Sequence, residues 1–233
     1  MHDIRALGAA LDVGTVDAMR FYVHGAGRAG REAWPAQADH GAVFADHSAA
    51  TGASDKAALL REQCPSRDVV LVAHSLGAVP AALGLDVTSL SHVILVEPAL
   101  YDVARGHDAV EAHVSAMTTA RESADAGDLF GYWQVVAPLM FGRSATDAAW
   151  EEDEPLAARF AAVEPPWGHG IDATAFGAVP MLVVTGGWTD EYEAIAACLA
   201  EAGASHVHLT GHRHRPQDHV DFEALVADFT GTP

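Results

Sequence analysis

One short stretch, Val69 to Val79, constrains the fold of this chain more than any other. It reads Val-Val-Leu-Val-Ala-His-Ser-Leu-Gly-Ala-Val, and its first four residues predict a buried strand. Residues 73–77 then form a sharp turn, and small residues begin a helix. A serine on such a turn, flanked two positions away by small residues, is typical of a nucleophile elbow. We therefore predict that Ser75 is a catalytic nucleophile. The alternative is a strand-to-helix turn that happens to contain serine, because Ala73 replaces the glycine of the stricter Gly-x-Ser-x-Gly pattern.

Short apolar segments alternate with longer helical patterns along the rest of the chain. This alternation predicts an α/β fold with a mostly parallel sheet of about six strands and helices on both faces. The expected strands are Arg20–Val23, Ala42–Ala45, Val69–Ala73, His92–Val96, Met181–Thr185 and His206–Leu209. The expected helices are Trp34–Asp39, Ser54–Gln63, Ala78–Leu85, Glu191–Ala202 and Asp218–Phe229.

The pattern changes between the fourth and fifth expected strands. Residues 98–179 have helical periodicity and contain Trp133, Trp150 and Trp167. We therefore expect a core built from residues 1–97 and 180–233, with residues 98–179 inserted as a helical cap. The acidic run Glu151–Glu154 within this segment is expected to be the solvated start of a helix.

Charge and cysteine content narrow the possible partners. The chain has 13 Lys and Arg against 32 Asp and Glu, a formal net charge of −19. Such a surface repels phosphate backbones and anionic lipids, so we expect no nucleic-acid partner and no membrane partner. The longest uncharged run, Val69–Leu85, is shorter than the roughly 20 residues that span a bilayer. No signal-peptide pattern opens the chain, and Cys64 and Cys198 have no metal or redox spacing. A cytoplasmic protein with a small-molecule ligand is expected, and the sequence carries no signal for its oligomeric state.

A serine nucleophile needs a base, and several histidines follow the last expected strand. The chain reads Gly-His-Arg-His-Arg-Pro-Gln-Asp-His over residues 211–219, so His212, His214 and His219 compete for this role. His212 follows a glycine, and His219 is expected to lie in the last helix. Two His-x-His pairs, at 206–208 and 212–214, also suggest a metal site as an alternative. Neither His-x-His-x-Asp-His nor His-Glu-x-x-His is present, so we expect no catalytic metal.

The base in turn needs an acid that holds its tautomer. Glu97 directly follows the fourth expected strand and precedes a proline, and it has no evident packing role. Asp190 follows the fifth strand, but as the N-cap of the next helix it would have a sufficient structural role. We favour Glu97 and keep Asp190 as the alternative.

The backbone N–H groups of an oxyanion hole are expected at two places. One is Leu76, directly after the serine. The other is the glycine-rich loop after the first strand, where Ala26 is the best candidate and Gly25 and Gly27 permit close approach. Gly25, Gly27 and Gly30 also satisfy Gly-x-Gly-x-x-Gly, with Asp46 as a possible acidic partner. Dinucleotide binding is the weaker interpretation because it leaves the elbow and the histidine unexplained.

In order along the chain, His24-Gly25, the elbow at 73–77, Glu97 or Asp190, and the His-x-Pro-Gln segment from His214 resemble the α/β-hydrolase superfamily. The resemblance spans Phe21 to Phe229. It implies His214 as the base, a cap that shapes the substrate pocket, and an eight-stranded fold. Because only about twenty residues precede the His24-Gly25 strand, the first one or two strands of that fold are expected to be missing or degenerate here. A serine nucleophile argues against the dehalogenase and epoxide-hydrolase branches, which need a carboxylate at that position.

These observations predict a serine hydrolase without metal or cofactor. It would cleave a carboxylic ester or lactone through an acyl-enzyme on Ser75. Carbon–carbon bond hydrolysis with the same residues is one alternative. A non-enzymatic ligand-binding protein on the same fold is the other.

Overall fold

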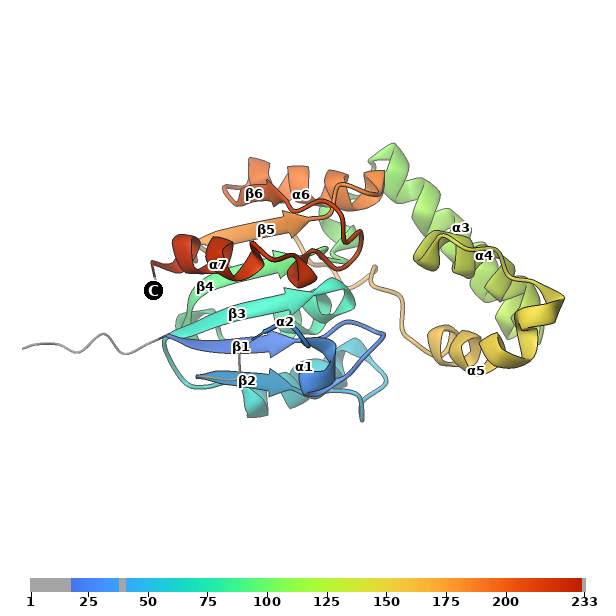
Figure 1. The fold of residues 1–233 in the computed structure, drawn as a ribbon, viewed down its shortest axis with the longest axis horizontal. Helices are drawn as coiled ribbons and strands as arrows, with labels where there is room; N and C mark the ends of the chain where they lie inside the picture. The colour runs from blue at the N-terminus through green and yellow to red at the C-terminus, as the bar shows by residue number, and fades with distance from the viewer. Residues whose placement is uncertain (1–17, 38–40, 232–233) are drawn as a thin grey trace, which may run out of the picture.

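A single parallel sheet forms the centre of the molecule in a computed structural model, which describes residues 18–37 and 41–231 (Figure 1). Its six strands have the order β2-β1-β3-β4-β5-β6, and every neighbouring pair is parallel. The predicted fold class is confirmed, and each predicted strand is present with small changes at its ends. The strands are β1 (Met19–Val23), β2 (Ala42–Ala45), β3 (Val69–His74), β4 (Leu90–Val96), β5 (Met181–Thr185) and β6 (Ser205–His208).

Four of the five helices expected from the sequence are present. They are α1 (Ala53–Gln63), α2 (Ala78–Gly84), α6 (Asp190–Glu201) and α7 (Phe222–Thr230), and the 3-10 turn Pro216–Asp218 stands where α7 was expected to begin. Five further 3-10 turns are Gly30–Ala33, Ser75–Gly77, Val87–Ser89, Tyr101–Ala104 and Asp147–Ala149. None of the helices in the described part of the chain is long and apolar enough to cross a membrane.

The helix predicted over Trp34–Asp39 is wrong for residues 34–37, which form a turn, and its remaining residues lie outside those described. The Arg31 side chain donates to the backbone carbonyl oxygens of Trp34 and, at 2.9 Å, Gln37. A helix would need the first of these carbonyls for its own ladder. The Trp34 ring instead packs 4.9 Å from the Tyr22 ring against the sheet.

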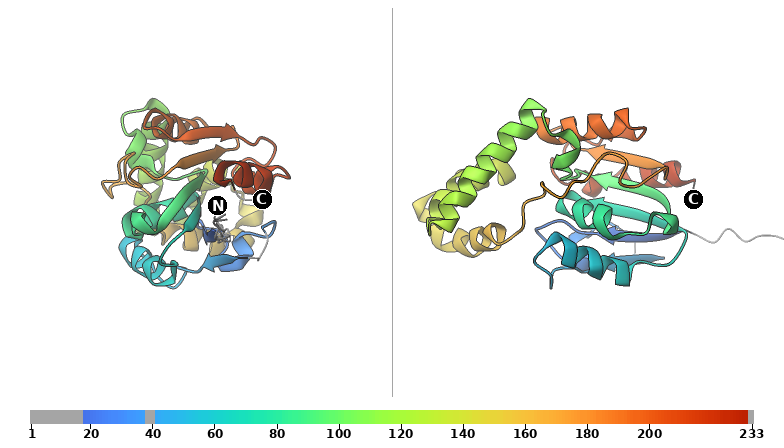
Figure 2. Two further views of the ribbon diagram at one scale, coloured as in Figure 1. Left: turned by 90° about the vertical axis from the view of Figure 1, so that its left-hand side faces the viewer. Right: turned by 180° about the vertical axis from the view of Figure 1, so that it is seen from behind.

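Alternating side chains along the strands divide the core into two layers, as the twofold repeat of a strand requires. Phe21, Leu71 and Leu95 face α1, α2 and α6 in one apolar cluster. Tyr22 and Val72 face α7 in the other. Figure 1 shows α7 in front of the sheet, and in the right-hand view of Figure 2, seen from the opposite side, α1 and α2 lie in front of it.

Three helices between β4 and β5 lie beyond the carboxyl ends of the strands (Figures 1 and 2). They are α3 (Asp108–Asp125), α4 (Leu129–Phe141) and α5 (Trp150–Ala161). These helices have an apolar cluster of their own, built around Trp133, Tyr132 and Ala157. The edge of the sheet where parallel strands end is therefore covered by a helical layer.

The acidic run at the start of α5 is only partly solvated. Glu151, Glu152 and Glu154 are exposed, but Asp153 is buried, against expectation. Its carboxylate accepts two hydrogen bonds of 2.6 Å from Arg143 and one of 2.9 Å from the Trp133 indole. These hydrogen bonds lower the pKa of Asp153, and the bonds from Arg143 have the largest effect. Asp153 thus ties α5 to the end of α4, which sequence periodicity did not reveal.

Candidate active site

Ser75 stands at the point where β3 turns into α2. Its backbone has φ of +53°, a left-handed conformation that strains any residue with a side chain. Two contacts hold this turn. A Cβ on Gly77 would lie 2.4 Å from the His24 carbonyl oxygen, so only glycine fits there. The Ala99 N–H donates to the Ser75 carbonyl at 3.1 Å, which links the turn to the loop after β4.

His214 reaches this serine from the loop between β6 and α7. Its Nε2 lies 2.9 Å from the Ser75 Oγ, within hydrogen-bond distance. The His74 ring contacts the His214 backbone carbonyl through Nε2 at 2.8 Å, and because a carbonyl only accepts, that nitrogen must donate. Burial is the main cause that lowers the pKa of His74 well below its usual range, and the neighbouring His214 lowers it further. A neutral His74 therefore fixes the backbone of the loop that positions His214.

Gly186 allows this loop to pass close to the end of β5. A Cβ on Gly186 would lie 2.0 Å from the Arg213 carbonyl oxygen, and Arg213 itself has φ of +48°. We therefore expect Gly186→Ala to displace the backbone next to His214 and to lower the free energy of unfolding by about 2 kcal/mol or more. Gly27→Ala is the matched control, because a Cβ there meets nothing within 4 Å. Equal thermal unfolding midpoints for the two variants would contradict this expectation.

Glu97 approaches the other nitrogen of the same imidazole. Its Oε2 lies 3.5 Å from the His214 Nδ1, at ion-pair distance, and Nδ1 has no hydrogen-bond partner among the described residues. The carboxylate is fully buried at the end of β4, on a backbone with φ of +46°. It accepts hydrogen bonds from the Gly186 N–H and, at 2.9 Å, from the Trp188 indole. These donors hold a buried negative charge beside the ring.

The other acid and the other histidines are not brought to this place. Asp190 is the exposed first residue of α6, after the N-cap Thr189, and it lines a separate hollow beside Glu193. The His212 ring packs 5.7 Å from the His219 ring, and the structure gives neither a contact with Ser75. His219 precedes α7 rather than lying in it.

Ala26, Ser75 and Leu76 together line a narrow pocket of about 60 Å³, the apolar pocket, between the sheet and the helical layer. The Gly25 backbone lies against the serine, since a Cβ there would be 3.0 Å from the Ser75 Cβ. Gly27 instead lines a neighbouring hollow. The wall of the apolar pocket is largely aromatic or apolar and includes Tyr101, Met117, Tyr132, Met140, Phe160, Trp167 and Tyr192. Its two charged members, Arg121 and Glu164, bond backbone groups: Arg121 donates to the Ala161 and Val163 carbonyls, and Glu164 accepts from the Ala53 N–H.

Tyr192 is a site residue that sequence reasoning missed. It lines the apolar pocket together with Ser75, and its ring lies 5.1 Å from the His214 ring. Burial, reinforced by the Glu97 charge, raises the pKa of Tyr192 well above its usual range, so the hydroxyl stays protonated. In the sequence Tyr192 is one apolar residue in the first turn of an expected helix, and no local pattern distinguishes it. Only the position of α6 after β5 brings it to the serine.

The glycine-rich loop lacks the helix that dinucleotide binding requires. In that motif a helix N-terminus faces the pyrophosphate. Over residues 24–37 the structure forms only the 3-10 turn Gly30–Ala33. Asp46 is occupied locally, accepting bonds of 2.9 Å from the Ser48 N–H and 2.6 Å from its hydroxyl.

A possible metal cluster lies elsewhere on the protein. Within the described ranges, Glu193, His206 and His208 offer ligand atoms within 4.8 Å of one another, at the junction of α6 and β6. His214 is not part of this group. The two His-x-His pairs of the sequence therefore have different environments, and only the second contributes to the candidate site.

Comparisons with known proteins support the fold. No family model and no curated protein matches this sequence. Among solved structures, a hydrolase from Oleispira antarctica superposes with a TM-score of 0.61 at 12% identity, over 93% of this chain and 92% of that one. An alpha/beta hydrolase enzyme from a Medee basin deep-sea metagenome library gives 0.55 at 14% identity, over 94% and 91%. An esterase from a Rhodococcus species gives 0.51 at 16% identity, over 92% and 90%. With the sheet order and the turn at Ser75, these similarities show that the chain has the α/β-hydrolase fold.

Proposed function

We propose that this protein is a serine hydrolase that cleaves a carboxylic ester or lactone through an acyl-enzyme on Ser75. The observation that carries the proposal is the 2.9 Å approach of the His214 Nε2 to the Ser75 Oγ. A nucleophile and a base at this distance, with the base beside a buried carboxylate, form the arrangement that activates a serine hydroxyl.

In the proposed reaction the Ser75 oxygen attacks the substrate carbonyl carbon while the His214 Nε2 takes the hydroxyl proton. The backbone N–H groups of Ala26 and Leu76 then bind the negative oxygen of the tetrahedral intermediate. His214 returns its proton to the leaving alkoxide, and an ester bond to Ser75 forms as the substrate ester bond breaks. A water molecule, deprotonated by His214, reverses these steps and releases the acid.

Glu97 is the carboxylate that we propose to stabilise the imidazolium form of His214. It lies 3.5 Å from Nδ1, a distance that shortens readily when the ring becomes charged. Asp190 has no such contact and is exposed, so we assign it no part in the reaction.

The substrate class is inferred from the pocket and from the structural neighbours. The apolar pocket offers aromatic and methionine side chains around the serine, which suits an uncharged acyl or alcohol group. Several neighbours of the same fold are described as hydrolases or esterases. We also propose that residues 98–179 act as the cap of a core made of residues 1–97 and 180–233.

A panel of short p-nitrophenyl esters and lactones tests this function. Wild-type protein should hydrolyse at least one class, and Ser75→Ala should lower its kcat/KM by about 10⁴-fold or more while the protein stays folded. Unchanged turnover in Ser75→Ala would exclude Ser75 as the nucleophile. Saturable binding without turnover would favour a non-enzymatic protein, and turnover only of a diketone would favour carbon–carbon bond hydrolysis.

A further inference from the structure

We propose that the substrate carries a carboxylate, which binds in a hollow beside the candidate active site. This hollow, the cationic hollow, has a volume of about 260 Å³. The inference rests on the proposed function, because it identifies the hollow as a subsite for the same substrate.

The cationic hollow adjoins the apolar pocket around Ser75. Ala26, Leu76 and Val163 line both, and the first two carry the N–H groups that we assign to the oxyanion. A group held in the hollow therefore lies next to the residues that we assign to the oxyanion hole. One ester molecule can occupy both spaces, with its reacting carbonyl at the shared wall.

The charge of this wall is opposite to that of the whole chain. Arg28 from the glycine-rich loop, Lys56 from α1 and Arg159 from α5 all line the hollow, and no Asp or Glu does. The chain as a whole has 32 acidic residues and 13 Lys and Arg. A patch of three cations without a carboxylate is therefore unexpected from composition, and it attracts anions into a cleft of a protein that otherwise repels them.

None of these three cations is held in an ion pair. The structure gives no hydrogen bond or ion pair for Arg28, Lys56 or Arg159 among the described residues. Elsewhere in the described chain, basic side chains do pair with acids, as Arg105 does with Glu111 at 2.7 Å and Arg215 with Asp218 at 2.6 Å. Two acids lie close to the hollow: the exposed Asp46, whose Oδ1 is 3.8 Å from the His24 Nε2, and the exposed Glu164. Burial lowers the pKa of Lys56, and the Glu164 charge, the smaller effect, raises it. Glu164 accepts from the Ala53 N–H and lines the adjoining apolar pocket, and neither it nor Asp46 lines the hollow, so the charged side chains of the wall itself are all cations.

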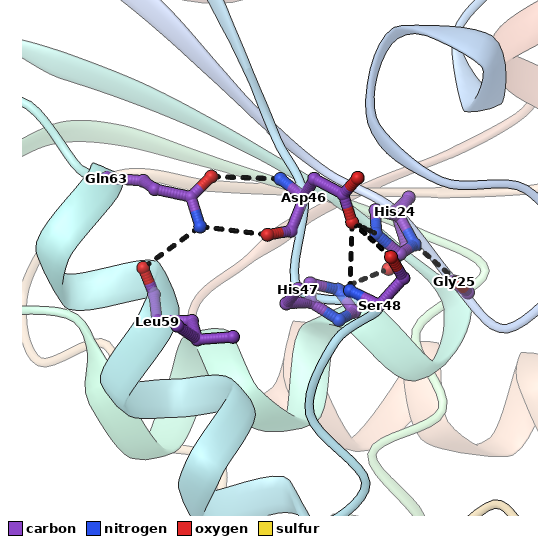
Figure 3. Close-up of polar contacts among 7 residues, drawn as sticks. All are labelled: His24, Gly25, Asp46, His47, Ser48, Leu59 and Gln63. Carbon is purple, nitrogen blue, oxygen red and sulfur yellow. Dashed lines mark hydrogen bonds and ion pairs between the residues drawn. The ribbon is translucent and has the colours of Figure 1, made fainter.

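Two histidines form another polar part of the wall, and Figure 3 shows them beside Asp46. The His24 and His47 rings stack with centroids 3.9 Å apart, and the His47 Nε2 bonds the His24 carbonyl at 3.1 Å. Burial lowers the pKa of both rings, that of His47 to about 4, so both are neutral at pH 7. The Gln63 side chain of α1 accepts a hydrogen bond from the Asp46 backbone N–H and donates one to the Asp46 backbone carbonyl, each at 2.9 Å. The positive charge of the hollow therefore comes from its three cations alone.

Two pairs of esters matched in size test the subsite. Monophenyl adipate against phenyl hexanoate places the charge on the acid, and 4-carboxyphenyl acetate against 4-methylphenyl acetate places it on the alcohol. In at least one pair we expect wild-type protein to prefer the anionic ester by about tenfold, and 0.5 M NaCl to reduce this preference by screening. Lys56→Met, which keeps most of the aliphatic stem, should lower the anionic-to-neutral ratio of kcat/KM by about fivefold. Arg28→Ala and Arg159→Ala should lower it in the same direction.

Arg67→Met is the matched control, because Arg67 is exposed and has no hydrogen bond or ion pair among the described residues. It precedes β3, at the amino ends of the strands, and the site lies at their carboxyl ends. It should leave the ratio unchanged. Equal rates for both members of each pair, insensitive to Lys56→Met, would overturn the subsite and leave the proposed function standing.

A binding measurement with adipate tests the anion subsite independently of the proposed hydrolysis. Calorimetry on Ser75→Ala should detect adipate binding that weakens when Lys56→Met is added. Such binding, with no ester hydrolysed by wild-type protein, would overturn the proposed function and support the anion site. No adipate binding, together with equal hydrolysis of the anionic and neutral esters in each pair, would exclude the anion site.

Discussion

His214→Ala should lower kcat/KM for a p-nitrophenyl ester by about 10⁴- to 10⁶-fold relative to wild-type protein. The reason is geometric, because the His214 Nε2, the proposed base, lies 2.9 Å from the Ser75 Oγ. Without it the hydroxyl keeps its proton and attacks poorly. Steady-state kinetics at pH 8, with circular dichroism to verify folding, measures the effect.

His212→Ala provides the control, since it removes a neighbouring imidazole from the same loop. The His212 ring packs against His219, and the structure gives it no contact with the serine. We therefore expect less than about a threefold change in kcat/KM, in keeping with a surface substitution away from the reacting atoms. A large loss in His212→Ala with little loss in His214→Ala would reverse the assignment of the base.

Glu97→Gln should lower kcat by about 10³- to 10⁴-fold, because an amide cannot stabilise the imidazolium as a carboxylate does. The substitution also has a structural cost. The new amide group must turn its NH₂ toward either the Gly186 N–H or the Trp188 indole, both of which donate to Glu97. A buried unsatisfied donor of this kind costs about 1–3 kcal/mol, so thermal unfolding must be measured on the same sample.

Asp190→Asn tests the alternative acid with the same change in chemistry. Asp190 is exposed at the start of α6 and has no contact with His214 in the structure, so kcat should change by less than about threefold. A fall in kcat confined to Asp190→Asn, with Glu97→Gln active and folded, would identify Asp190 as the acid.

Much of the fold was predictable from local sequence patterns. The strands follow from apolar, β-branched runs such as Val69–Val72, and the two core layers follow from the alternation of their side chains. The turn at Ser75 was also recognisable, because the small residue Gly77 is required by a backbone approach of 2.4 Å. Steric requirements of this kind leave a local mark in the sequence.

The features that could not be predicted depend on particular side-chain contacts, some local and some between distant segments. The turn at residues 34–37 replaces a helix because the Arg31 side chain takes two backbone carbonyls. Asp153 is buried because Arg143 and Trp133 both donate to it. Tyr192 reaches Ser75 only through the packing of α6 beside β5. None of these partners is identified by periodicity, composition or spacing.

Covalent labelling of Ser75 tests the central claim most directly. Wild-type protein is treated with a fluorophosphonate and analysed by peptide mass spectrometry, with Ser75→Ala and His214→Ala in parallel. The account predicts one adduct per chain, on the peptide that contains Ser75, absent from Ser75→Ala and formed far more slowly in His214→Ala. An adduct on a different residue, or ester turnover by a protein whose Ser75 stays unlabelled, would contradict it.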